Sequence, residues 1–402
     1  MNSTKEWNCL GATWLVLFTG LVVRLALSGH YLLTPDEANY WQWSRYLDIG
    51  YYDHPPMIAW TIHLATNLFG QTEFAVRLPT VLGMTTASAY LCLLAARWFS
   101  CRCAFHVALV SQAVLLFNGS ALIATPDGLL LPCWAAACYH GAQALERNRL
   151  GQWLMTGIWF GLGLLSKYTM FLFLPSLFFC MFFQPVHRKK LVGFKPWLGL
   201  ISGLLVFAPV IVWNSRHDWV TFRHVLFQGG VDNKALVTLR YIGDFFASQA
   251  ALISPVIFLY ILAAWMGGWA SKRLKPGDGP YLTWMSMAPF AVFSILAFHV
   301  RIYGNWPAPA YLSAVVLICA LYSPGQEGRK KEHYRFWNFG IGLAFFMSLA
   351  VMVQLVYPVL PVRVDLDRTA RETRGWDKLG MAVHNVLAEM PHPEETFVFG
   401  LR

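Results

Sequence analysis

Thr34-Pro35-Asp36-Glu37 begins a polar loop that runs from residue 29 to residue 76, between the first two apolar segments of the chain. An aromatic run follows at 40–46, and then the stretch Tyr51-Tyr52-Asp53-His54-Pro55-Pro56. In a chain that is 56% hydrophobic, this loop gathers five acidic residues: Asp36, Glu37, Asp48, Asp53 and Glu73. An ionisable side chain beside hydrocarbon is costly, so these carboxylates indicate chemistry at one membrane surface.

The apolar segments around this loop predict an all-α polytopic membrane protein. A chain of 402 residues with this share of apolar side chains is not typical of a soluble protein. We predict about eleven transmembrane helices from the lengths of the apolar runs. They cover 9–28, 78–97, 104–122, 128–145, 152–166, 168–184, 197–213, 245–268, 281–300, 307–322 and 336–357.

The distribution of basic residues predicts the orientation in the membrane. With the N-terminus in the cytoplasm, about half of the 31 Lys and Arg residues fall in cytoplasmic segments. The loop at 29–76 and the tail from 358 onward then face the other side. This topology explains much of the net charge of +10. No soluble segment has the basic stripe with interleaved aromatic residues that would indicate nucleic-acid binding.

The polar loop is expected to form two short helices on the membrane surface. Thr34 and Glu37 have the spacing of a capping box, for a helix that runs to about Leu47. Asp53 is expected to cap a second helix, which Gly70 ends.

Two domains are expected, a transmembrane domain at 1–357 and an outer-face tail at 358–402. The tail has a helical pattern at 376–390, followed by a strand-like stretch at 396–399. One helix and one strand cannot bury a core alone. We therefore expect the tail to be the start of a truncated small α/β domain.

Two carboxylates are the candidate catalytic residues. Asp36 is in the first turn of its helix, where an ionised carboxylate is favoured and could accept a proton from an attacking hydroxyl. Capping explains Glu37, which we also keep among the substrate-binding candidates. Asp127, in Thr125-Pro126-Asp127, repeats the arrangement on the same face and either decorates a helix start or takes part in the chemistry. Two such carboxylates could orient a nucleophile or hold a divalent cation.

The remaining candidates would contact an anion. Lys167 lies at a short outer connection and requires an anionic partner, which would be a carboxylate, a lipid headgroup or a substrate phosphate. His54 and Arg301 either contact the same phosphate or anchor the chain at the interface, and Asp53 is grouped with them as a substrate-binding candidate. Arg24 is charged and well inside a span, and we expect it to reach outward to the interface.

Several common motifs are absent from the sequence. There is no P-loop, no dinucleotide-binding G-x-G-x-x-G, no H-E-x-x-H and no nucleophile elbow. A nucleotide-sugar donor would call for a soluble nucleotide-binding domain, and the sequence has none. A sugar donor would therefore arrive through the membrane as a lipid. A transporter or flippase of lipid-linked sugars is the alternative, and it would place ionisable residues along a path through the middle of the membrane.

Five stretches together resemble a known enzyme family: 34–37, 51–56, 125–127, 166–168 and Asn-Trp-Pro-Ala-Pro at 305–309. They are similar to the GT-C glycosyltransferases of family 39, which include protein O-mannosyltransferases and bacterial enzymes that transfer aminoarabinose to lipid A. The resemblance implies an inverting transfer of sugar from a polyprenyl-phosphate donor to an envelope lipid, glycan or protein. It also implies a bacterial inner-membrane location with the active site on the periplasmic side.

The resemblance assigns roles to three residues. Asp36 corresponds to the family's first-loop acid, Asp127 to its second carboxylate, and Lys167 to a basic residue that helps to hold the donor phosphate. The chain departs from the aminoarabinose branch at His54, where that branch has a lysine. Bacterial relatives continue well past the last span, so we expect this chain, which ends at Arg402, to be truncated.

Overall fold

The computed structural model describes residues 3–229, 237–269, 271, 274–324, 331–363 and 367–398. Regular secondary structure in these residues is entirely helical. The helices are α1 (Ser3–Leu27), α2 (Pro35–Arg45), α3 (Met57–Phe69), α4 (Glu73–Trp98), α5 (Cys101–Ala113), α6 (Leu115–Leu122), α7 (Pro126–Arg147), α8 (Leu150–Ser166), η1 (Tyr168–Leu172), α9 (Phe173–Phe183), α10 (Pro185–Leu191), α11 (Phe194–Arg216), α12 (Val220–Gln228), α13 (Arg240–Ile253), α14 (Pro255–Gly267), α15 (Asp278–Leu296), α16 (Ala308–Tyr322), α17 (Lys331–Val356), α18 (Arg368–Thr373) and α19 (Trp376–Ala388).

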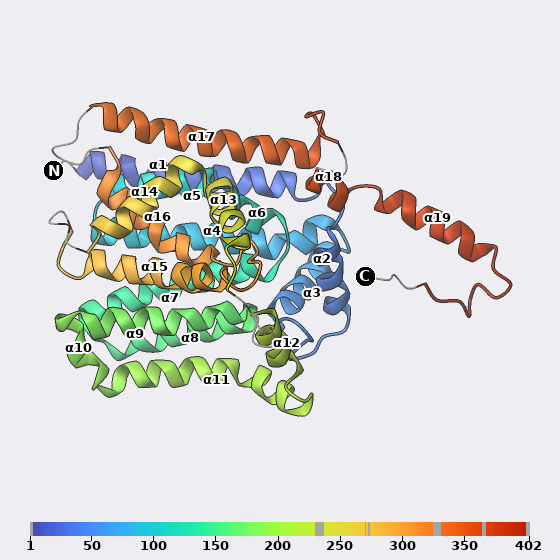
Figure 1. Cartoon of the computed structure of the whole chain (residues 1–402), viewed down its shortest axis with the longest axis horizontal. Helices are drawn as coiled ribbons and strands as arrows, with labels where there is room; N and C mark the ends of the chain where they lie inside the picture. Colours follow the sequence, from blue (N-terminus) through green and yellow to red (C-terminus); the bar gives the residue numbers. More distant parts are fainter. Residues whose placement is uncertain are drawn as a thin grey trace.

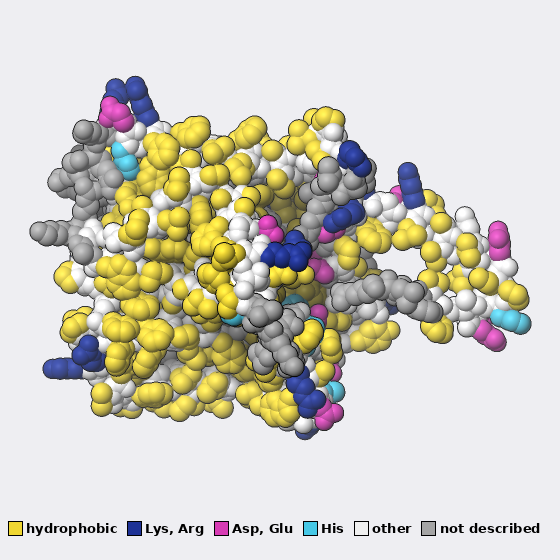
Figure 2. All heavy atoms as spheres, viewed as in Figure 1, with side chains coloured by type: hydrophobic (Ala, Val, Ile, Leu, Met, Phe, Trp, Pro, Cys, Tyr) yellow, Lys and Arg dark blue, Asp and Glu magenta, His cyan; other side chains and the backbone are white. Residues whose placement is uncertain are grey.

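The long helices lie side by side in one bundle (Figure 1). The helices α2, α3 and α12 lie at one end of this bundle, which we call the loop end, and α10 and the N-terminus lie at the other. Hydrophobic side chains cover most of the visible sides of the bundle (Figure 2). This distribution is typical of a protein whose sides face lipid.

The centre of the bundle is formed by helices that are apolar on all sides. Nearly every residue of α7 and α16 is buried. A helix that is hydrophobic all round belongs inside a protein, where other helices cover it. Both helices begin at the loop end, so their first residues are held firmly beneath the polar loop.

The helices α8 and α11 approach each other closely through glycines. A Cβ atom built on Gly199 would lie 2.5 Å from the carbonyl oxygen of Trp153, and one built on Gly203 would lie 2.6 Å from that of Gly157. Small residues spaced four apart allow membrane helices to pack at this distance. The contact holds α8, whose last residue Ser166 precedes Lys167, against α11.

Each predicted span is helical, but the span count is not settled by helix length. In the part of the chain that the structure describes, four helices are long and apolar enough to cross a membrane: α1, α4, α11 and α17. The number rises to 7 when each pair of bent helices is taken as one span. The predicted span at 245–268 is two helices, α13 and α14, which meet at 108°, and the span at 104–122 bends by 64° between α5 and α6.

In the tail, the predicted helix is present and the predicted strand is not seen in the residues that the structure describes. The pattern at 376–390 corresponds to α19, which extends away from the bundle (Figure 1). Residues 396–398 are not in a strand, and residue 399 lies outside the described residues. A strand requires a neighbouring strand for its backbone hydrogen bonds, and the described residues provide none.

Candidate active site

A buried cluster at the loop end joins three distant parts of the chain. The Lys167 ammonium group lies 2.8 Å from each carboxylate oxygen of Asp127, and both residues are buried. The Asn305 amide donates a hydrogen bond of 2.7 Å to Oδ2 of the same carboxylate. The predicted need of Lys167 for an anionic partner is thus met by the Asp127 carboxylate.

Helix ends place these side chains. Pro126 begins α7, which puts Asp127 in its first turn, and Lys167 follows the last residue of α8. The Thr125 side chain does not cap α7, and the Asp127 carboxylate is turned toward Lys167. Of the two interpretations of Asp127, the one in which it merely decorates a helix start does not account for this ion pair.

His54 lies beside this cluster as a neutral imidazole. Burial and the nearby positive charges of Lys167 and His224 lower the pKa of His54 to about 3. At neutral pH its ring therefore has one N–H donor and one acceptor nitrogen. The sequence groups His54 with the side chains that would contact a phosphate. The lowered pKa changes that role, because only a single neutral N–H is available.

The loop that carries His54 is held against α11 and α12. The Trp213 indole donates a hydrogen bond of 2.8 Å to Asp48, and the Thr221 hydroxyl donates one of 2.7 Å to the carbonyl oxygen of Tyr51. The Tyr51 ring stacks on Trp43 with ring centroids 4.4 Å apart. These contacts of Asp48 and Tyr51 thus hold the segment that leads into His54.

A second buried ion pair organises the start of α2. Glu37 and Arg77 are fully buried, with two contacts of 2.8 Å between the carboxylate and the guanidinium group. The predicted capping box is confirmed, because Thr34 and Glu37 bond to each other's backbone N–H groups. The same carboxylate accepts a 2.8 Å hydrogen bond from the backbone N–H of Ala124. Both Glu37 oxygens thus accept hydrogen bonds from protein groups, which gives this residue a structural role.

Arg77 extends this network to the end of α1. Its guanidinium group donates hydrogen bonds of 2.7–2.9 Å to the carbonyl oxygens of Ser28, Tyr31 and Leu32. It also lies over the Tyr31 ring, 3.7 Å from the centroid. We call Glu37 and Arg77 the buried hub. The hub fixes the backbone next to Asp36 and the turn that leads into α7.

Asp36 lies at the exposed edge of this arrangement. Its side chain is exposed in the first turn of α2. Tyr40 is one turn further along the same face, and its ring centroid is 5.9 Å from that of His54. The structure therefore places Asp36 on the face of α2 that leads to the His54 and Lys167 cluster. An exposed carboxylate remains accessible to a substrate, whereas that of Asp127 is bonded to protein groups.

The other candidates lie around the same end of the bundle. Asp53 is partly buried and close enough for its charge to act on Tyr168, the residue after Lys167. It does not cap α3, whose N-cap is Pro56 without a side-chain hydrogen bond, so that prediction was wrong. Gly70 ends α3 as predicted. Arg301 is exposed on the loop that also carries Asn305.

Sequence reasoning missed Arg77 and the bond from Asn305 to Asp127. The signal for Arg77 was an arginine near the outer end of a span, where the positive-inside rule does not expect one. The expectation for Arg24 was wrong, because its side chain is buried and donates to Asn118 Oδ1 at 2.9 and 3.1 Å. A buried amide can hold a guanidinium group inside a bundle and so removes the need to reach the interface.

Six charged side chains are buried in the described residues. Glu37, Arg77, Asp127 and Lys167 lie at the loop end, Arg24 is one turn inside α1, and Asp367 is in the tail. Among the described residues, no group of three or more His, Cys, Asp and Glu side chains is placed to hold a metal ion. Carboxylate, ammonium, amide and imidazole groups gather at the loop end of the bundle.

Residues 53–213 match the model of the dolichyl-phosphate-mannose-protein mannosyltransferase family. This part of the chain is thus a domain similar to that of family 39. The matched range includes His54, Asp127 and Lys167 and ends at Trp213, which holds the His54 loop. The resemblance that the short motifs indicated is thus confirmed.

Two bacterial glycosyltransferases are similar to this protein over much of the chain. The lipid A galacturonosyltransferase RgtD of Rhizobium johnstonii is 29% identical over 73% of this chain and 61% of its own length. The undecaprenyl phosphate-alpha-4-amino-4-deoxy-L-arabinose arabinosyl transferase of Pectobacterium atrosepticum is 26% identical over 72% of this chain and 56% of its own. The chain thus spans less than two thirds of the length of either relative.

A solved structure shows the same fold. The crystal structure of ArnT from Cupriavidus metallidurans bound to undecaprenyl phosphate matches with a TM-score of 0.65 at 20% identity. The match covers 88% of this chain and 66% of that chain. The all-α GT-C architecture expected from the sequence is therefore confirmed, while the number of spans remains a prediction.

Proposed function

We propose that this protein is an inverting glycosyltransferase that moves a sugar from a polyprenyl-phosphate donor to an envelope lipid. The observation that carries the proposal is the buried cluster of Asp127, Lys167 and Asn305 beside His54, within a family 39-like domain. The relatives named above are transferases of galacturonic acid to lipid A and of aminoarabinose from undecaprenyl phosphate, which supports both substrate classes.

The cluster has donors left for a phosphate. An ammonium group has three N–H donors, and Lys167 uses two of them on Asp127. Asn305 uses one of its two amide N–H donors, and neutral His54 supplies one more. Because the Asp127 carboxylate balances the Lys167 charge, the cluster contains no uncompensated buried charge before the donor binds. A donor phosphate would be bound by these remaining N–H donors, which are already in position.

In the proposed reaction, Asp36 accepts the proton of the acceptor hydroxyl as that oxygen attacks the anomeric carbon. The bond from the anomeric carbon to the phosphate oxygen breaks, and the polyprenyl phosphate leaves with one additional negative charge. Lys167, Asn305 and His54 stabilise this growing charge, which fixed donors shielded from water do effectively. Arg301 lies on the same loop as Asn305, and we assign it to the outer rim of the donor site.

The position of the buried charges favours an enzyme over a transporter. A transport path requires ionisable residues through the middle of the membrane. In the described residues, four of the six buried charged side chains lie at the loop end, and Arg24 is one turn inside α1. Chemistry at one surface accounts for this distribution better than passage across the membrane does.

Purified protein in detergent tests the proposal through Lys167. Incubation with a synthetic polyprenyl-phosphate sugar and bacterial envelope lipids should release polyprenyl phosphate and yield sugar-bearing lipid, both measured by mass spectrometry. Lys167→Ala should lower transfer by roughly ten- to a hundred-fold, because a charge-assisted hydrogen bond contributes about 1.5–3 kcal/mol. Lys167→Arg should retain part of the activity.

Lys195→Ala is the matched control. Lys195 bonds to the Asn148 carbonyl oxygen at the far end of the bundle, so its loss should leave transfer unchanged. A folded protein that released no polyprenyl phosphate, yet moved lipid-linked sugar across liposomes, would establish the transporter instead.

We also propose eleven spans, with the loop end in the periplasm and the N-terminus in the cytoplasm. The bundle has the N-terminus and the tail at opposite ends, which supports an odd number of crossings (Figure 1). The basic helix α10 is at the far end, as the positive-inside rule expects of a cytoplasmic segment.

Cysteine labelling with an impermeant reagent tests this orientation. Asn39→Cys and Glu389→Cys are both exposed in the structure and should react in intact spheroplasts. Lys189→Cys in α10, also exposed, should react only after the membrane is opened. Labelling of only one of the first two would rule out the eleven-span arrangement.

A further inference from the structure

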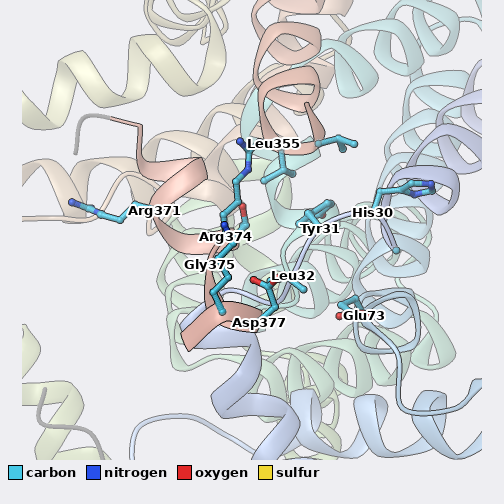
Figure 3. Close-up of a pocket in the computed structure, with 13 residues that line it drawn as sticks. His30, Tyr31, Leu32, Glu73, Leu355, Arg371, Arg374, Gly375 and Asp377 are labelled. Atoms are coloured by element: carbon cyan, nitrogen blue, oxygen red, sulfur yellow. The ribbon is translucent and has the colours of Figure 1, made fainter. Parts of the chain in front are cut away.

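A pocket opens at the loop end, apart from the buried cluster around Lys167. It has a volume of about 850 Å³ and lies between the ends of α1 and α17 and the tail (Figure 3). Tyr31 and Leu32 line it from the end of α1, and Leu355 and Val356 line it from the end of α17. These residues give the pocket an apolar floor.

The tail is fixed over this floor by Gln354 of α17. The Gln354 amide donates a 2.7 Å hydrogen bond to Asp367 and accepts one of 2.9 Å from the Leu360 backbone N–H. The Arg374 guanidinium group donates to the Gln354 carbonyl oxygen at 3.0 Å and lies beside Leu355 (Figure 3). The wall formed by the tail is therefore attached to the bundle.

The pocket is lined by groups of both charges. Arg371, Arg374 and Lys378 are basic residues of the tail, Asp377 is a carboxylate of the tail, and Glu73 is a carboxylate at the start of α4. Figure 3 shows Asp377 beside Leu32 at the floor, while Arg371 extends from the rim. Guanidinium and ammonium groups bind phosphate, and carboxylates accept hydrogen bonds from hydroxyl groups. A single headgroup with a phosphate and free hydroxyls could bind the basic groups through its phosphate and the carboxylates through its hydroxyls.

The pocket is next to surfaces that suit acyl chains. On α1, Phe18 and Val22 are exposed, and on α17, Phe346, Leu349 and Val353 are exposed. Both helices are apolar enough to cross a membrane. A lipid could therefore keep its chains along the bundle while its headgroup lies at the loop end, as apolar exposed surfaces of this kind suggest.

We propose that this pocket binds the phosphorylated, hydroxyl-bearing headgroup of a membrane lipid, and that this lipid is the acceptor. The second half of the proposal rests on the transferase function proposed above. Arg77 joins the two sites, because it bonds to the Tyr31 and Leu32 carbonyl oxygens and to Glu37. The pocket floor is thus linked to the residue next to Asp36, and the acceptor approaches Asp36 from the side opposite the donor phosphate.

Binding to the purified protein tests the pocket without any need for turnover. Short-chain phosphatidylglycerol has a phosphate and two hydroxyls, and calorimetry should show that it binds more tightly than phosphatidylcholine of equal chain length. Arg371→Gln with Lys378→Gln should raise its dissociation constant about ten-fold, as expected for two basic groups near an anionic headgroup. The control Arg216→Gln with Arg223→Gln removes two exposed charges from α11 and α12 and should change it less than about two-fold.

Free glycerol phosphate separates a lipid site from a simple phosphate site. If glycerol phosphate bound as tightly as the lipid, or if the Arg371 and Lys378 variant bound like the parent, the lipid pocket would be wrong. In the transfer reaction, phosphatidylglycerol should compete with the acceptor. Competition with the donor instead would overturn the acceptor assignment. A protein that transferred no sugar could still bind the lipid more weakly in the Arg371 and Lys378 variant. That result would support the lipid pocket and refute the proposed transferase reaction.

Discussion

Asp36→Asn should lower sugar transfer by a factor of about 10² to 10⁴, the range that a general base contributes. The substitution keeps the size of the side chain and removes its ability to accept a proton. Because the Asp36 side chain is exposed and not buried like the hub side chains, the variant should fold and bind the polyprenyl-phosphate donor like the parent. Transfer is measured by mass spectrometry, and donor binding by calorimetry on the same preparation.

Asp218→Asn provides the control for this result. Asp218 is exposed between α11 and α12, and its loss should leave the rate unchanged. If Asp36→Asn transferred sugar like the parent while folded Glu37→Gln did not, the base would be Glu37. The bonds that Glu37 makes to Arg77, Thr34 and Ala124 argue against that assignment.

Arg77→Met should lower the free energy of unfolding by about 3–5 kcal/mol, because it leaves the Glu37 carboxylate buried without its cation. It also removes the donors that hold the carbonyl oxygens at the end of α1. The measurement is thermal or denaturant unfolding in a fixed detergent. Adding Glu37→Leu to Arg77→Met should restore part of the stability, since an apolar pair no longer contains a lone charge.

Arg97→Gln on the same helix is the matched control. The Arg97 and Glu146 side chains form an ion pair of 2.7 Å but are 26% and 40% exposed. An exposed pair contributes about 0–1 kcal/mol, so this change should have little effect. If Arg77→Met and Arg97→Gln lowered the free energy of unfolding equally, burial would not make the Glu37–Arg77 ion pair more important for stability than an exposed pair.

The fold was largely predictable because each helix leaves a local signal. Apolar runs located the spans, and the spacing of Thr34 and Glu37 located the start of α2. The bends within 104–122 and 245–268 were missed, because an apolar run does not record where a helix changes direction. The failed cap at Asp53 has a similar cause, since its side chain could be placed only by tertiary packing.

The site was predictable as a set of residues and not as a set of contacts. Lys167 was expected to need an anion, and the structure supplies Asp127, which is 40 residues away in the chain. Asn305 reaches the same carboxylate across 178 residues, a distance at which no local pattern operates. Arg77 was overlooked because its partners are a capping residue and three backbone carbonyls, none of which a motif requires.

The buried hub has a consequence for how mutants of this protein behave in cells. Glu37 is next to Asp36 in the chain, and it also bonds to the turn that precedes Asp127. Substitutions in the hub should therefore reduce the amount of folded protein and the activity together. A genetic screen that scores only modified lipid would rank Glu37 and Arg77 beside Asp36. Normalising that score to the amount of protein in the membrane separates loss of abundance from loss of chemistry.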